Sequence, residues 1–265
     1  MPSVRSGDAE IFYEILGQGP PVVLLHPFPA NHELWKPAAQ ALISRYKLIV
    51  PDLRGHGDSG LGDGPAIMQK HAADIARVMD DAEVPRAAMA GISIGGYALF
   101  EFWRQFRGRV ASLALMNTKA QADTGAAKAA RLKSADEVLE HGTEQFFHDM
   151  AQKVMGKTTH STRPDLVEGA LGMMRKMSSK DVAGVQTGMA DRPDSTATLK
   201  TITVPTLLIT GDEDNLTGLP EADFMRQRIP GAQMKVIPRG GHYAAWEQPE
   251  EAGRILRQFL DAVCT

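Results

Sequence analysis

Short apolar runs recur along the chain and alternate with stretches of helical periodicity. Six runs lack the polar alternation of a half-exposed strand, which is typical of strands buried on both faces of a parallel sheet. These six runs are residues 21–26, 47–50, 87–90, 110–116, 206–210 and 233–237. Residues 8–16 alternate more regularly and predict an antiparallel hairpin at an edge of the sheet.

Apolar residues spaced three to four positions apart fill most intervals between the runs. This periodicity predicts helices over residues 67–82, 94–106 and 250–263. Strands that alternate with helices in this way predict an α/β fold, in which helices cover both faces of a mostly parallel sheet.

The alternation stops between residues 119 and 200. This stretch is rich in Ala and Met, contains no convincing strand, and predicts three or four helices. They lie near residues 125–141, 143–156, 164–177 and 179–189. We interpret the stretch as a helical cap over the strand ends; helices packed on one flank of the sheet are the alternative. The chain thus divides into a discontinuous core, residues 1–120 and 199–265, and an inserted cap, residues 121–198.

Charge and cysteine content narrow the class of protein. The 29 Lys and Arg residues nearly balance the 32 Asp and Glu residues, for a net charge of −3. Because nucleic acids and anionic membranes attract positive fields, this balance argues against both as partners. The single cysteine, Cys264, excludes an internal disulfide and a cysteine-rich zinc site. No apolar run approaches the ~20 residues of a membrane helix, and the polar N-terminus resembles no export signal, so we expect a cytoplasmic protein.

A serine stands between a predicted strand and a predicted helix. Gly91 and Gly95 flank Ser93 in a G-x-S-x-G pattern. A sharp turn there would hold the Ser93 hydroxyl at the strand end, beside a helix N-terminus whose dipole favours a nearby oxyanion. Glycines at the flanking positions leave room for such a turn. The alternative is a glycine-rich packing turn; a phosphate-binding loop is excluded because no Gly-Lys-Ser/Thr sequence follows.

A serine hydroxyl needs a base to act as a nucleophile, and the base needs an orienting carboxylate. His242 follows the last predicted strand, and Asp214 follows the strand before it. Both therefore stand at carboxyl ends of strands, where they could reach Ser93. Asp212 is the alternative carboxylate in the same loop. The order Ser93, Asp214, His242 is the nucleophile–acid–base order of one hydrolase fold.

Five segments in order resemble the α/β-hydrolase superfamily, and they run through nearly the whole chain. They are His26-Pro27-Phe28-Pro29, residues 52–59, residues 91–96, Gly211 with Asp214, and Gly241-His242 with Glu247 and Pro249. The resemblance implies a mostly parallel sheet of about eight strands with flanking helices. It also implies oxyanion donors from the backbone N–H groups of Phe28 and Ile94. Pro27 replaces the family's usual glycine and has no N–H, but the implied donor is one residue further on.

Within the superfamily, residues 26–29, residues 52–59 and the cap are similar to bacterial 3-oxoadipate enol-lactonase-like hydrolases and to the cofactor-free esterase/perhydrolase group. We therefore expect a serine hydrolase that cleaves a small ester or lactone through an acyl-enzyme on Ser93, without a cofactor. The alternatives are a perhydrolase of haloperoxidase type, a C–C bond hydrolase on the same triad, and a non-catalytic ligand receptor.

Two further patterns bear on what this site would bind. The histidines show no paired ligand spacing, so we expect no metal site. Basic and acidic residues nearly balance within the cap, which favours an uncharged or weakly charged substrate. No pattern in the sequence predicts an oligomeric state.

Overall fold

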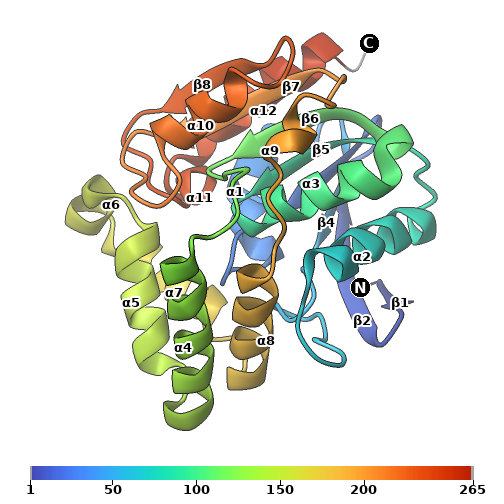
Figure 1. Ribbon diagram of the computed structural model, residues 1–265. Helices are drawn as coiled ribbons and strands as arrows, with labels where there is room; N and C mark the ends of the chain where they lie inside the picture. The colour runs from blue at the N-terminus through green and yellow to red at the C-terminus, as the bar shows by residue number, and fades with distance from the viewer. Residues whose placement is uncertain (1, 264–265) are drawn as a thin grey trace.

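Eight strands form one sheet in the computed structural model, which describes residues 2–263 (Figure 1). Their order across the sheet is β1-β2-β4-β3-β5-β6-β7-β8. The strands are β1 (Ser3–Ser6), β2 (Ala9–Leu16), β3 (Pro21–Leu25), β4 (Lys47–Pro51), β5 (Ala87–Ile92), β6 (Val110–Met116), β7 (Thr206–Gly211) and β8 (Gln233–Ile237). β2 is antiparallel to both β1 and β4, and all other neighbours are parallel. The predicted α/β fold is confirmed; Cys264 lies outside the described residues.

The antiparallel edge differs from the predicted hairpin over residues 8–16. Ala9–Leu16 forms one strand, and its hairpin partner is β1. Because β2 also pairs with β4, β1 is the edge strand of the sheet. The prediction missed β1 because its four residues, Ser-Val-Arg-Ser, are too few and too polar to give an apolar pattern.

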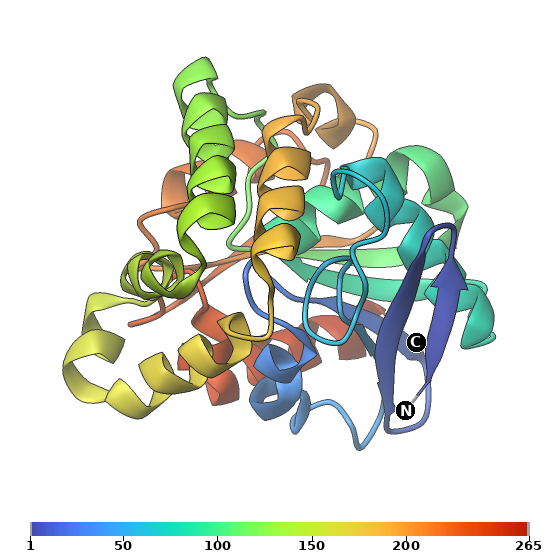
Figure 2. The ribbon, with the colours of Figure 1, turned by 90° about the horizontal axis from the view of Figure 1, so that it is seen from below.

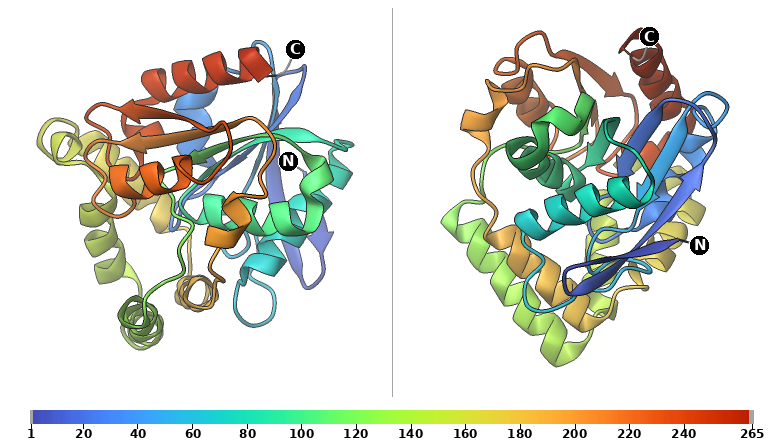
Figure 3. Two further views of the ribbon diagram at one scale, coloured as in Figure 1. Left: turned by 45° about the horizontal axis from the view of Figure 1, so that its top comes forward. Right: turned by 90° about the vertical axis from the view of Figure 1, so that its right-hand side faces the viewer.

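Helices cover both faces of the sheet, as predicted. α1 (Lys36–Ala39) and α12 (Pro249–Val263) lie on one face, and α2 (Met68–Asp81), α3 (Ile94–Phe106) and α10 (Leu219–Arg226) lie on the other (Figure 3). The short elements of the core are η1 (His32–Trp35), η2 (Arg107–Arg109) and α11 (Ala244–Glu247).

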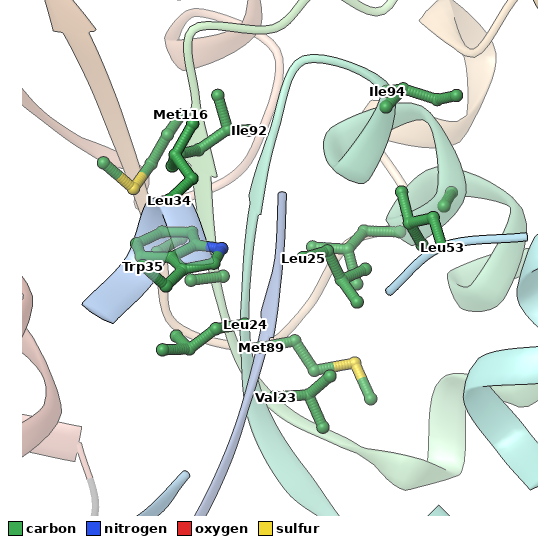
Figure 4. Packing of buried hydrophobic residues seen from close by; sticks show 14 of the residues in the cluster. Val23, Leu24, Leu25, Leu34, Trp35, Leu53, Met89, Ile92, Ile94 and Met116 are labelled. Atoms are coloured by element: carbon green, nitrogen blue, oxygen red, sulfur yellow. The ribbon is translucent and has the colours of Figure 1, made fainter. Parts of the chain in front are cut away.

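The interior is formed by both faces of the central strands. Leu24 and Leu25, consecutive residues of β3, are fully buried and point to opposite faces of the sheet (Figure 4). On one side lies Trp35, and on the other lies Leu53. The uninterrupted apolar run that predicted this strand therefore reflects burial on both faces.

The chain between β6 and β7 is helical. Its helices are α4 (Gly125–His141), α5 (Glu144–Val154), α6 (Lys157–Thr162), α7 (Pro164–Met174), α8 (Ser179–Ala190) and the short α9 (Thr196–Leu199). We call α4–α8 the inserted helices; they extend away from the sheet (Figure 1), and α4 and α8 lie side by side (Figure 2). The sequence did not predict α6, because its polar residues carry no apolar periodicity. No helix in the described part of the chain is long and apolar enough to cross a membrane.

The two ends of the insertion lie side by side. The Ser195 N–H donates to the Ala120 carbonyl at 2.8 Å. The Ala122 N–H donates to the Asp194 carboxylate at 3.1 Å. The inserted helices thus leave and rejoin the core at one place, while β6 and β7 stay paired.

Candidate active site

Ser93 lies on a sharp turn between β5 and α3. Its backbone has φ 53° and ψ −114°, a conformation that strains a residue with a Cβ. Two glycines make the turn possible. A Cβ on Gly91 would lie 2.6 Å from the carbonyl carbon of Gly95, and a Cβ on Gly95 would lie 2.7 Å from the carbonyl oxygen of Leu25. The G-x-S-x-G pattern therefore marks a strained turn at the carboxyl end of β5.

His242 and Asp214 meet in the loops after β8 and β7. The Nδ1 atom of His242 lies 3.0 Å from Oδ2 of Asp214, and both side chains are buried. Asp212, the alternative carboxylate, is exposed and accepts a hydrogen bond from the Arg239 N–H at 2.7 Å. The structure thus brings Asp214, and not Asp212, to the histidine.

The Asp214 carboxylate is surrounded by hydrogen-bond donors. The N–H groups of Leu216 and Thr217 donate to Oδ1 at 2.8 and 3.1 Å, and Asn117 Nδ2 donates to Oδ2 at 2.8 Å. Burial raises the pKa of Asp214, but His242 and these donors lower it more, so the net shift is well below its ordinary value. Sequence reasoning assigned no role to Thr217 or to the Asn117 amide; the Asn117 contact joins two loops that are distant in sequence.

Phe28 and Ile94 carry the backbone N–H groups predicted for the oxyanion hole. Within residues 2–263, neither N–H donates to another group of the chain. Phe28 also lines the cavity that contains Ser93. The carbonyl of Pro27 accepts a hydrogen bond from the Ala30 N–H at 3.0 Å, which holds this loop in a tight turn. The donor role of the two amides stays a prediction.

A buried histidine joins this loop to the loop after β4. The Nδ1–H of His26 donates to the Pro27 carbonyl at 2.9 Å, and Nε2 accepts from the Leu53 N–H at 2.9 Å. Burial lowers the pKa of His26 to about 4, so the ring is neutral and Nε2 is free to accept. In the same loop, Arg54 donates two hydrogen bonds to Asp74, at 2.9 and 2.7 Å. These contacts fix the loop after β3 and the loop after β4 relative to each other and to α2.

A second buried carboxylate, Glu247, holds the loop that carries His242. Its Oε1 accepts the Gly241 N–H at 2.9 Å, and its Oε2 accepts the Gly156 N–H at 2.7 Å and the Thr159 hydroxyl at 2.6 Å. Burial raises the pKa of Glu247, and the hydrogen bonds offset this only in part. Glu247 therefore ties a core loop to the segment between α5 and α6. In the sequence, Glu247 stood out only as part of the segment with Gly241, His242 and Pro249 that resembles the superfamily.

A cavity of about 360 Å³ opens at these residues. Ser93, Thr217 and His242 line it from the core, and Met150 and Met189 line it from the inserted helices. Its volume is in the range of small-molecule sites, which is roughly 300–1,000 Å³. Methionine side chains are flexible and adapt to ligands of irregular shape. The cavity thus brings a serine and a histidine together in a space that suits a small molecule.

Among the described residues, one cluster has ligand atoms close enough together to hold a metal ion: His32, Asp52 and Asp58. Oδ1 of Asp52 accepts hydrogen bonds from the His32 N–H at 2.7 Å and from its Nδ1 at 2.8 Å. Oδ2 accepts from the Asp58 N–H at 2.8 Å. The carboxylate of Asp52 is therefore used to fix the two loops that it touches.

Comparison with known proteins identifies the family. A family model described as alpha/beta hydrolase fold matches residues 20–249. The chain belongs to the α/β-hydrolase family. The matched region contains Ser93, Asp214 and His242, so this α/β hydrolase carries its candidate site within the part that defines the family.

Two curated relatives resemble this α/β hydrolase along most of its length. A putative carbamate hydrolase, RutD, from Azorhizobium caulinodans is 29% identical over 272 residues, which cover 99% of each chain. The 3-oxoadipate enol-lactonase 1 of Acinetobacter baylyi is 26% identical over 253 residues, which cover 92% of this chain and 90% of the relative.

Solved structures show the same fold. An esterase from Thermogutta terrifontis, solved with malate bound, is 33% identical and matches 100% of both chains with a TM-score of 0.96. The enol-lactonase from Burkholderia xenovorans is 21% identical and matches 98% of this chain and 100% of that one, with a TM-score of 0.91. The predicted resemblance to enol-lactonase-like and esterase members of the superfamily is confirmed.

Proposed function

We propose that this α/β hydrolase cleaves a small carboxylic ester or lactone through an acyl-enzyme on Ser93. One observation carries the proposal: Ser93 and His242 line one cavity, and the Nδ1 atom of that histidine lies 3.0 Å from Asp214. A nucleophile, a base and an orienting carboxylate are the groups that acyl transfer on serine requires. The relatives named enol-lactonase and esterase support an ester or lactone substrate.

In the first step, Ser93 Oγ attacks the carbonyl carbon and Nε2 of His242 takes the hydroxyl proton. The Nδ1–H of His242 donates to ionised Asp214, which fixes this tautomer and stabilises the imidazolium. The N–H groups of Phe28 and Ile94 then bind the negative charge that develops on the carbonyl oxygen. Each such donor is worth about 3–4 kcal/mol when it is preorganised.

In the second step, His242 gives its proton to the leaving alcohol oxygen as the C–O bond breaks. An ester thereby releases its alcohol, whereas a lactone keeps its new hydroxyl on the acyl chain. Water next attacks the acyl group on Ser93, and His242 removes a proton from that water. The bond between Ser93 Oγ and the acyl carbon then breaks as His242 returns that proton to Oγ, which releases the carboxylic acid and restores the free serine.

The direct test is hydrolysis of p-nitrophenyl butyrate by the wild type and by Ser93→Ala. We expect kcat to fall by about 10⁴-fold or more, because the nucleophile is gone. Ser112→Ala is the matched control, since Ser112 is a buried serine of β6 that does not line the cavity. The control should keep the wild-type rate. An unchanged rate in Ser93→Ala would refute the proposal.

Covalent trapping tests the acyl-enzyme separately. A p-nitrophenyl alkylphosphonate should react once per chain, release one p-nitrophenolate and leave the phosphonyl group on Ser93. Peptide mass spectrometry identifies the modified residue. Modification elsewhere, or none in a protein that hydrolyses esters, would contradict an acyl-enzyme on Ser93.

A further inference from the structure

Basic side chains gather in the cavity beside the proposed nucleophile. Lys119, in the segment after β6, Arg131 of α4 and Lys153 of α5 all line it. Asp123 is the one acidic residue among the described residues of the lining. The lining thus holds three cations and one carboxylate, although the protein as a whole carries a net charge of −3.

The carboxylate in this lining is already matched by buried arginine. Asp123 Oδ2 lies 2.6 Å from Arg131 Nε and 2.7 Å from Arg192 Nη1, and the Asp123 side chain is 2% exposed. Burial raises the pKa of Asp123, but the two arginines lower it more, to about 2. Arg192 itself stacks over the ring of Tyr97, 4.3 Å from its centroid. Lys119 Nζ also lies 3.6 Å from Asp123 Oδ1, so one carboxylate faces three cations and the lining keeps a positive charge.

Two of these cations are placed to receive a ligand. Arg131 is held by Asp123 and by Gln186, whose Oε1 accepts from Arg131 Nη1 at 2.8 Å, so its guanidinium has a fixed orientation. The Lys153 ammonium has no hydrogen bond or ion pair with any described residue. A guanidinium fixed by its neighbours and an ammonium without a partner, both in one lining, form a site for an anion.

The same two residues lie where two cavities meet. A second cavity, of about 490 Å³, runs between α4 and α5, and Arg131 and Lys153 line both spaces. Ala130 and Met150 are the other two residues shared. The basic pair therefore stands where the cavity that contains Ser93 adjoins the second cavity.

We propose that the substrate of this hydrolase carries a carboxylate, which Arg131 and Lys153 bind while the reactive carbonyl lies at Ser93. The substrate class is then an ester or lactone with a second, ionised carboxyl group. This inference rests on the proposed function, because it takes Ser93 as the nucleophile. The charge balance of residues 121–198, which favoured an uncharged substrate, does not describe the cavity. Of the acidic residues of the inserted helices, Glu137 and Asp149 line only the second cavity, and Glu144 and Asp165 form ion pairs on the exterior.

Two pairs of aryl esters of similar size test this. Mono-p-nitrophenyl glutarate carries a carboxylate on the acyl side and is compared with neutral p-nitrophenyl pentanoate. 4-Carboxyphenyl pentanoate carries a carboxylate on the leaving group and is compared with neutral 4-carbamoylphenyl pentanoate. We expect the wild type to favour one of the anionic esters over a neutral ester with the same leaving-group reactivity by about 10-fold or more in kcat/KM. The preferred ester shows which side of the scissile bond faces Arg131 and Lys153.

Variants locate the source of the preference. Lys153→Gln removes an ammonium that has no partner, so it breaks no interaction that stabilises the fold. It should lower the ratio of kcat/KM for the anionic ester to that for the neutral ester by about 10-fold. Lys153→Glu should reverse the preference. The matched control is Lys133→Gln on α4, where the side chain is 78% exposed and faces Glu137 at 3.4 Å. The control should leave the ratio unchanged.

The outcomes separate the two proposals. Hydrolysis that depends on Ser93 but shows no preference for either anionic ester overturns this inference and leaves the proposed function standing. A preference that survives Lys153→Glu overturns it as well. Absence of any hydrolysis that depends on Ser93 overturns the proposed function and this inference with it. Calorimetry on Ser93→Ala gives a readout without turnover: glutarate should bind more tightly than pentanoate, and Lys153→Gln should remove the difference.

Discussion

The two oxygens of Asp214 have different partners. Oδ1 accepts from the backbone of Leu216 and Thr217, which fixes the carboxylate relative to its own loop. Oδ2 accepts from Asn117 and faces His242 Nδ1. Because Oδ1 is saturated by fixed N–H donors, Oδ2 is the oxygen that meets the histidine, and its direction does not depend on the histidine's own position.

Replacement of Asp214 by Asn should therefore abolish most activity. An Asn amide that presents its NH₂ group toward Nδ1 favours the wrong tautomer of His242, so we expect kcat to fall by about 10³–10⁴-fold. The measurement is p-nitrophenyl butyrate hydrolysis, with circular dichroism to show that the variant folds. Asp212→Asn is the control. The Asp212 side chain is exposed, and among the described residues its hydrogen-bond partner is the backbone N–H of Arg239. A larger loss in the control would show that the wrong carboxylate had been assigned.

At the scale of elements, one buried carboxylate joins parts of the chain that are distant in sequence. Glu247, at the end of α11, accepts hydrogen bonds from the loop after β8, from Gly156 just before α6 and from Thr159 in α6. Three donors converge on it, and the Glu247 side chain is buried. The loop with His242 and the inserted helices are therefore positioned by the same side chain.

Glu247→Gln should destabilise the fold although it preserves the side-chain volume. One carboxylate oxygen becomes an NH₂ group that faces an N–H or hydroxyl donor, and the lost bond leaves a buried donor unsatisfied. We expect the free energy of unfolding to fall by about 1–3 kcal/mol. Urea denaturation measures the change. Glu250→Gln, at an exposed glutamate of α12, serves as the control and should stay within about 0.5 kcal/mol of the wild type.

The core elements were predictable from sequence because each carries its own apolar pattern, and Ser93, Asp214 and His242 could be named because each stands next to a strand end with a nearby glycine. Features that depend on contact between distant segments were not predictable. Glu247 meets Gly156 only because α11 and the inserted helices pack together. Similarly, the basic lining draws on residues from α4, α5 and the segment after β6, whose side-chain directions no local pattern reveals.

At the scale of the whole molecule, burial keeps three histidine rings of the core uncharged. Burial lowers the pKa of His26 to about 4 and that of His71 to about 3, and it places the pKa of His56 well below the ordinary value. His26 and His56 pack against each other, with ring centroids 4.9 Å apart. The folded protein thus keeps these rings neutral under conditions in which a solvated histidine is charged.

Acid should therefore weaken the fold in the pH range in which a solvated histidine gains its proton. Below about pH 6.5 these histidines bind protons in the unfolded chain but not in the folded protein, which favours the unfolded chain. The stability present above that pH is therefore lost as the pH falls toward the pKa values of the folded protein. From pH 7 to pH 5 we expect the free energy of unfolding to fall by roughly 3–5 kcal/mol. The raised pKa of Glu247 acts in the opposite direction and reduces the fall.

Urea denaturation at closely spaced pH values measures this slope. His141→Gln, at a histidine whose side chain is 69% exposed, is the control and should leave the fall in place. A free energy of unfolding that stays constant or rises between pH 7 and pH 5 would show that the buried rings are not neutral.

The hydrogen bond between Ala120 and Ser195 marks a joint, where the inserted helices leave and rejoin the core. Met150, Met189, Arg131 and Lys153 line the cavity from the stretch between these residues, whereas the Ser93 turn and the Asp214 loop follow strands of the sheet. Because the ends of the insertion already touch, lengthening or replacing it adds little loop-closure entropy, which grows only slowly with length. Evolution could thus exchange the inserted helices that line the cavity without rebuilding the strand ends that carry Ser93, Asp214 and His242.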